Sequence, residues 1–177
     1  MDRVLASGAK GCRFDPCPAY FNTQFFFIVN DEYWMELAFQ EALRSAQNRD
    51  FPVGAVVVID EEAISRAGNE RYLSHSPLGH AEAIAITRAA EILGDWRLTQ
   101  ATVYVTMEPC PMCSGLMLQT RIKRLVYGVP SYREGCAGSV VNLLDYPGMA
   151  HHIEVCSGML SKKISDLMQD FFLDSRS

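Results

Sequence analysis

Three residues with metal-binding side chains and one acidic residue stand at spacings that suit a catalytic metal site. His80 is followed two positions later by Glu82, and Cys110 and Cys113 stand three positions apart. One imidazole and two thiolates make three protein ligands, the number that a catalytic zinc ion keeps while its fourth position stays open for water. Glu82 is then placed to move protons at that water. The set predicts hydrolytic chemistry at a zinc centre.

Both halves of this motif are expected at the starts of helices. Side chains two positions apart in mid-helix point to different sides, so His80 and Glu82 can serve one site only if the metal lies at the first turn. Cys110 and Cys113 share one face, and Pro111 between them suits the first helical position. The unpaired N–H groups and partial positive charge of a helix N-terminus also favour thiolate over thiol.

A structural zinc site is the alternative, and such a site usually has a fourth protein ligand. The remaining histidines are His75, His151 and His152, and none of them stands in a tight motif with the other ligands. A structural site would also leave Glu82 without a role. The sequence therefore favours a catalytic zinc site.

Hydrophobic periodicity predicts helices alternating with strands around these motifs. The predicted helices cover 31–47 (capped by Asp31), 80–93, 111–120 and 161–172, and the predicted strands cover 52–60, 63–68, 102–106, 125–129 and 153–156. This alternation is typical of an α/β layered sheet. Residues 1–30 show no regular period, which predicts a disordered or loosely docked extension before a domain over 31–177.

Composition limits the class of protein. The chain has 177 residues, 49% of them hydrophobic, which suits one globular domain. No apolar run reaches the roughly 18 residues that span a bilayer, and no signal peptide is recognised, so no membrane partner is expected. Cysteines outside the metal motif lack metal-like spacing, which favours a reduced, cytoplasmic protein. A net charge of −5 makes a nucleic-acid partner less expected, although only the local footprint must be positive.

Further segments extend well beyond the metal motif and keep a specific order. They are Pro52–Val58, Asn69, His80–Glu82, Leu98, Tyr104–Thr106, Glu108–Cys113, Arg121–Ile122, Tyr127–Gly128, Gly135, Gly138–Ser139, Asn142–Leu144 and Phe171–Phe172. Together with the zinc nucleobase-deaminase signature H-x-E then P-C-x-x-C, they resemble the bacterial-type tRNA-specific adenosine deaminases of the cytidine/deoxycytidylate deaminase superfamily. The resemblance covers about residues 33–173.

The resemblance implies an α/β fold with three layers, α-β-α and cytidine deaminase-like, around a mixed five-stranded sheet, assembled as a homodimer. It implies a hydrolase acting on a C–N bond of a cyclic amidine, which converts adenosine to inosine at the wobble position of a tRNA anticodon. The implied partner is the anticodon stem-loop of a tRNA, where an unpaired base is flipped at little cost.

The same resemblance implies roles for individual residues. His80, Cys110 and Cys113 would hold one Zn²⁺ per subunit, and Glu82 would be the catalytic proton carrier. The implied substrate-binding residues are the loop asparagine Asn69, Val53 at the base pocket and the C-terminal aromatic Phe172.

Two other functions remain open, and the chain departs from the family at the site mouth. A free-base deaminase, such as a guanine deaminase, would use the same zinc site, although 116–122 follows the tRNA type. A non-catalytic RNA-binding subunit could lose Glu82, which is present. Ser76–Gly79 before the ligand histidine, together with Pro130 and Ser131, differ from the usual family residues and predict a diverged RNA contact surface.

Overall fold

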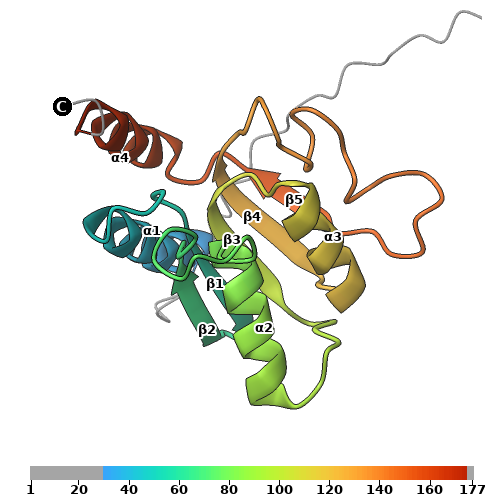
Figure 1. The fold of residues 1–177 in the computed structure, drawn as a ribbon. Coiled ribbons are helices and arrows are strands. Elements are labelled where there is room, and N and C mark those ends of the chain that lie inside the picture. The colour runs from blue at the N-terminus through green and yellow to red at the C-terminus, as the bar shows by residue number, and fades with distance from the viewer. Residues whose placement is uncertain (1–29, 175–177) are drawn as a thin grey trace, which may run out of the picture.

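Five strands form one mixed sheet in the computed structural model, which describes residues 30–174. The sheet order is β2-β1-β3-β4-β5 (Figure 1). Strand β1 pairs antiparallel with β2 and β3, whereas β3, β4 and β5 are parallel neighbours. The strands are β1 (Gly54–Ile59), β2 (Glu62–Gly68), β3 (Thr102–Met107), β4 (Arg124–Val129) and β5 (Glu154–Ser157).

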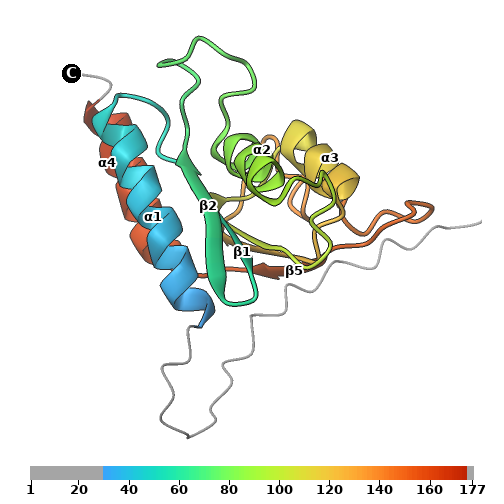
Figure 2. The same ribbon diagram turned by 90° about the horizontal axis from the view of Figure 1, so that it is seen from below.

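The helices cover both faces of this sheet. They are α1 (Asp31–Gln47), α2 (Ala81–Leu93), α3 (Pro111–Thr120) and α4 (Ser161–Asp174). Helices α1 and α4 lie side by side on one face, and α2 and α3 lie on the other (Figures 1 and 2). The predicted three-layer α-β-α fold with a mixed five-stranded sheet is confirmed. Among the described helices, none is long and apolar enough to cross a membrane.

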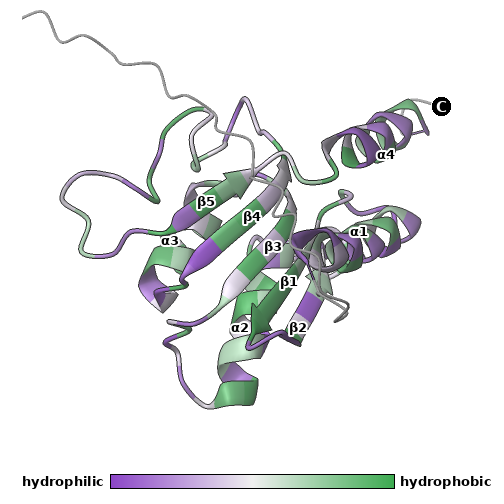
Figure 3. Ribbon diagram, turned by 180° about the vertical axis from the view of Figure 1, so that it is seen from behind, coloured by the Kyte–Doolittle hydropathy of each residue, from purple (hydrophilic) through white to green (hydrophobic). Residues whose placement is uncertain are grey.

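The core lies on both faces of the central strands. Because helices cover both faces, β1 is a nearly continuous hydrophobic run and does not alternate with polar residues. Val56, Val57 and Val103 are completely buried. Figure 3 shows the same hydrophobic band across the middle of the sheet, with hydrophilic residues toward the outer faces of the helices.

One predicted detail at the start of α1 is wrong. The helix is capped by Asn30, whose side-chain oxygen accepts from the Tyr33 N–H at 3.0 Å, and not by Asp31. The Asp31 carboxylate instead accepts two hydrogen bonds from the Arg124 guanidinium, at 2.7 and 2.8 Å, and a third from the Tyr104 hydroxyl at 2.7 Å. This cluster joins α1 to β3 and β4.

The prediction of an extension over residues 1–30 falls outside the described residues, apart from Asn30. The other element boundaries agree with the predicted ranges to within about two residues.

The topology brings the chemical motifs to one edge of the sheet. Because β1 runs antiparallel to β2 and β3, the start of β1 lies at the same edge as the ends of the other two strands. Helix α3 begins a few residues after β3, and the loop 69–79 leads from the end of β2 to α2. The N-termini of α2 and α3 therefore converge beside the start of β1.

Candidate active site

The predicted metal ligands meet where α2 and α3 begin. His80 is the N-cap of α2, Cys110 is the N-cap of α3, and Pro111 occupies the first turn of α3, as expected. The His80 Nδ1 atom lies 3.7 Å from Cys110 Sγ and 3.6 Å from Cys113 Sγ. Ideal tetrahedral zinc bonds would place a nitrogen and a sulfur ligand about 3.6 Å apart. The donor set therefore fits zinc in both chemistry and spacing.

The electrostatics of the two thiols also suit a metal. A hydrogen bond from the Cys113 thiol lowers the pKa of Cys110 to about 4, and the imidazole of His80 adds to this effect. The hydrogen bond to Cys110, together with burial, raises the pKa of Cys113. The pair thus holds one thiolate and one proton, which a bound cation would displace.

No fourth protein ligand completes the cluster among the residues that the structure describes. Only His80, Cys110 and Cys113 bring ligand atoms within 4.8 Å of one another. His151 Nε2 lies 2.7 Å from the Ile122 carbonyl oxygen, and His75 lies in the exposed loop before α2. His152 Nδ1 lies 2.8 Å from the Asp145 carboxylate. This three-ligand arrangement matches a catalytic zinc site with an open position.

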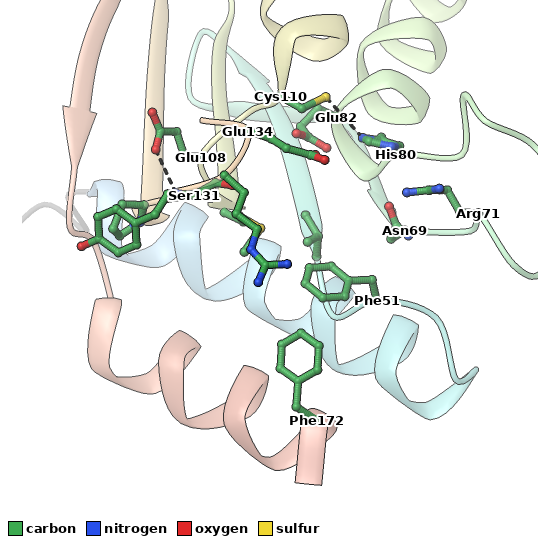
Figure 4. A pocket seen from close by; sticks show the side chains of 15 residues that line it. Phe51, Asn69, Arg71, His80, Glu82, Glu108, Cys110, Ser131, Glu134 and Phe172 are labelled. Atoms are coloured by element: carbon green, nitrogen blue, oxygen red, sulfur yellow. Dashed lines mark hydrogen bonds between the residues drawn. The ribbon is translucent and has the colours of Figure 1, made fainter. Parts of the chain in front are cut away.

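Glu82 lies beside this cluster in the first turn of α2 (Figure 4). Its side chain is buried, with 4% of the residue exposed. Burial raises its pKa to about 7, although the nearby imidazole of His80 opposes the shift. A buried carboxyl group next to an open metal position is suited to carry a proton between water and substrate.

A cavity of about 720 Å³ opens in front of the metal ligands. Val53, Asn69 and Phe172, the three predicted substrate-binding residues, all line it with His80 and Glu82 (Figure 4). They come from the start of β1, the end of β2 and the end of α4. The remaining lining residues are Phe51, Arg71, Met107, Glu108, Cys110, Pro130, Ser131, Tyr132, Arg133 and Glu134.

Phe172 stands at the rim of this cavity. Its ring centroid lies 5.7 Å from that of Phe51, and Phe171 completes an aromatic cluster with both. With 48% of the residue exposed, Phe172 still presents apolar surface to a ligand. The helical spacing of Phe171 and Phe172 is also compatible with packing alone, and here the Phe171 ring packs against Phe51.

Sequence reasoning assigned no role to Glu108, which shapes the cavity wall. This buried carboxylate accepts hydrogen bonds from the backbone N–H groups of Ser131 at 2.9 Å, Ala137 at 2.9 Å and Ser139 at 3.0 Å. It thereby holds the loop after β4 against the start of α3. An acidic residue directly before Pro109 was visible in the sequence, but its partners lie more than twenty residues further along the chain.

Sequence reasoning also assigned no role to Asp50. Asp50 is completely buried and accepts a hydrogen bond from the side-chain amide of Asn69 at 2.6 Å.

The fold and the site define a zinc-dependent deaminase. The sequence profile described as the cytidine and deoxycytidylate deaminase zinc-binding region matches residues 28–129, more than half of the chain. The chain belongs to the cytidine and deoxycytidylate deaminase family.

Within this family, the chain is similar to a tRNA-specific adenosine deaminase of Bacillus subtilis. The two are 39% identical over 149 residues, which are 84% of this chain and 92% of the relative.

Solved structures of similar fold agree with the assignment to the deaminase family. One, from a study of A-to-I editing by tRNA:A34 deaminases at the wobble position of transfer RNA, is 36% identical with a TM-score of 0.74. The match covers 76% of this chain and 98% of that one. A guanine deaminase from Bacillus subtilis is 27% identical with a TM-score of 0.56, covering 79% of this chain and 92% of that one.

Proposed function

We propose that the protein is a tRNA-specific adenosine deaminase, which converts the wobble adenosine of an anticodon to inosine and releases ammonia. The observation that carries this function is the placement of Asn69 and Glu82 in one cavity with a three-ligand zinc site. The similarity to tRNA-specific adenosine deaminases over 84% of the chain selects the substrate class.

The roles of the site residues follow from their chemistry. His80, Cys110 and Cys113 hold zinc, which when bound lowers the pKa of a water molecule toward about 7. Glu82 takes one proton from the attacking water and delivers it to N1 of the adenine. It then takes the second proton of that oxygen, now bonded to C6, and delivers it to the amine, which leaves as ammonia while the C6 carbonyl of inosine forms. Its buried position keeps these protons away from bulk water.

The walls of the cavity suit a nucleoside taken out of its stack. Val53 offers an apolar surface to the base, and Asn69 offers an amide to a polar group of the nucleoside. Phe172 at the rim is available to stack on a neighbouring unpaired base. Arg71 and Arg133, also at the cavity, are placed to contact phosphates.

The direct test is a deamination assay on the zinc-loaded full chain. The substrates are an anticodon stem-loop with adenosine at the wobble position, the same stem-loop with guanosine there, free guanine and free adenosine. Inosine formed in the adenosine stem-loop alone is the expected result. Release of ammonia from free guanine with no inosine in RNA would identify a guanine deaminase. Binding of the stem-loop without any turnover would identify a non-catalytic RNA-binding subunit.

The homodimer and the cytoplasmic location belong to the same proposal. A homodimer is expected by resemblance to the family, and light scattering coupled to size exclusion checks it, since a monomeric mass would contradict it. A reducing compartment such as the cytoplasm, where tRNA is present, suits the thiols of Cys136 and of the two metal-site cysteines.

A further inference from the structure

We propose that Asp50 is a positioning residue: it fixes the side-chain amide of Asn69 so that the amide oxygen faces the nucleoside bound beside Glu82. This inference rests on the proposed function, because it places Asn69 against the bound nucleoside. Asp50 is absent from the lining of the cavity, so it acts through its neighbours.

Asp50 is a completely buried carboxylate with four hydrogen-bond donors around it. Its Oδ1 atom accepts from the Asn69 side-chain amide at 2.6 Å and from the Phe51 N–H at 2.9 Å. Its Oδ2 atom accepts from the Tyr72 N–H at 2.7 Å and the Leu73 N–H at 3.2 Å. No cation pairs with it within residues 30–174.

The chemistry of the pair dictates how the Asn69 amide is turned. An ionised carboxylate only accepts hydrogen bonds, so the NH₂ group of Asn69 must face Asp50. The Oδ1 atom of Asn69 is therefore turned away from Asp50, and Figure 4 shows it on the side of His80. No group among the described residues donates to this oxygen, which leaves it available to a hydroxyl or N–H group of a nucleoside.

The same carboxylate also secures the turn that carries Arg71. The N–H groups of Tyr72 and Leu73, the two residues after Arg71, are bound to Asp50 Oδ2. The Arg71 side chain lies at the cavity next to Asn69 (Figure 4). One buried carboxylate thus holds Asn69 and the turn that carries Arg71, both about twenty positions further along the chain.

A merely structural Asp50 would stabilise the loop without affecting how Asn69 acts on the substrate. The two roles differ in a double-mutant cycle, because a residue that acts through Asn69 loses its effect once the Asn69 amide is gone. The cycle compares wild type, Asp50→Asn, Asn69→Ala and the double variant. Asp60→Asn is the matched control, since it makes the same chemical change in the exposed turn at the far end of β1.

The measured quantity is kcat/KM for inosine formation in the stem-loop, with zinc content and melting temperature measured on each protein. Asp50→Asn is expected to lower kcat/KM by about 10- to 100-fold in the wild-type background. Both carboxylate oxygens of Asp50 accept from N–H groups, so the NH₂ group of the introduced amide faces another donor in either orientation. In the Asn69→Ala background the same change is expected to cost only about two- to threefold, because the hold of Asp50 on the turn that carries Arg71 is then all that is lost. Asp60→Asn is expected to leave kcat/KM unchanged.

Equal losses in the two backgrounds would overturn the inference and leave Asp50 with a structural role alone. If Asp50→Asn does not fold, Asp50→Glu replaces it in the cycle, because glutamate keeps the charge and both acceptors but displaces them by one methylene. A wild-type protein that forms no inosine would contradict the proposed function itself. An active wild type with equal losses would contradict only the role of Asp50.

Discussion

At the scale of single residues, the buried position of Glu82 makes its carboxyl group suitable for proton transfer near neutral pH. Replacing this group by an amide removes the transferable proton but keeps the size and shape of the side chain. We expect Glu82→Gln to lower the single-turnover rate of inosine formation by about 10³-fold, within the range of general acid–base catalysis. Zinc content is expected to stay at the wild-type level, because Glu82 is not among the clustered ligands.

The matched control is Glu91→Gln, which makes the same change on an exposed residue of the same helix. Its rate is expected to equal that of the wild type. A Glu82→Gln variant that keeps more than about a tenth of the wild-type rate would show that another group carries the proton.

The sequence predicts residues of the site well where their spacing is local. His80 and Glu82, like Cys110 and Cys113, belong to single helical turns, so elementary helix geometry was enough to place them together. Asp50 could not be found in this way. Its partners lie up to 23 positions away, and only the tertiary fold brings them to it.

At the scale of elements, the close contact of α1 with β1 depends on the absence of a side chain at Gly54. A Cβ atom there would lie 2.0 Å from the Ala38 carbonyl oxygen and 2.5 Å from the Ala42 nitrogen, both backbone atoms of α1. We expect Gly54→Ala to lower the free energy of unfolding by about 2–3 kcal/mol, because the helix must move away from the strand. Urea denaturation measures this change.

Gly115 in α3 provides the comparison for this variant. A Cβ atom there has no heavy atom within 4 Å outside its own helix backbone and chain neighbours. Gly115→Ala is therefore expected to leave stability unchanged or to raise it by about 0.5–1 kcal/mol, since alanine favours a helix over glycine. A Gly54→Ala variant that is as stable as Gly115→Ala would mean that the α1–β1 contact is not tight.

The turn that leads from α1 to β1 should have a pH-dependent stability through Asp50. Burial by itself raises the pKa of Asp50, but hydrogen bonds from the Asn69 amide and from the N–H groups of Leu73, Phe51 and Tyr72 outweigh it and hold the pKa below the ordinary value of 3.8. A carboxylate with a lowered folded-state pKa contributes stability above its unfolded pKa, and that contribution is lost as pH falls through the folded pKa.

The test compares zinc-free wild type with zinc-free Asp50→Asn by urea denaturation across pH. Wild type is expected to be more stable by a constant amount between about pH 5 and 8, and the difference is expected to shrink below about pH 4. A difference that grows on acidification would contradict the sign of this pKa shift.

The helices and strands could be predicted because their hydrophobic periods are clear. The N-cap of α1 differs from the prediction, and Asp31 makes a tertiary contact instead. Asn30 caps α1, and the Asp31 carboxylate binds the Arg124 guanidinium of β4. This contact joins residues 93 positions apart, so no local pattern indicates it.

At the scale of the whole molecule, the layered sheet places the three metal ligands and Glu82 at one edge. The alternation of elements predicted the layers, but the pairing of β1 with β3 and the strand order could not be derived from periodicity alone. They decide that the start of β1 lies beside the N-termini of α2 and α3. The site is thus a property of the topology as much as of the motif.

The net charge of −5 leads to a prediction about RNA binding by the full chain. Long-range attraction to phosphates is weak for a chain of this charge, so affinity must come from the cations at the cavity. In the described part of the chain these are Arg71 and Arg133. Each contact with a phosphate of a single-stranded loop contributes about −0.7 to the slope of log K against log salt concentration, so a slope of about −1.4 is expected.

Titrations of the stem-loop at several salt concentrations, with zinc-loaded Glu82→Gln to prevent turnover, measure this slope. Arg71→Ala and Arg133→Ala are each expected to make it shallower by about 0.7. Arg97→Ala removes an exposed guanidinium that pairs with Asp95 and lies over Trp96 beyond the end of α2, and it is expected to leave the slope unchanged because Arg97 does not line the cavity. A slope steeper than about −3, unaffected by either cavity arginine, would place the phosphate contacts elsewhere on the molecule.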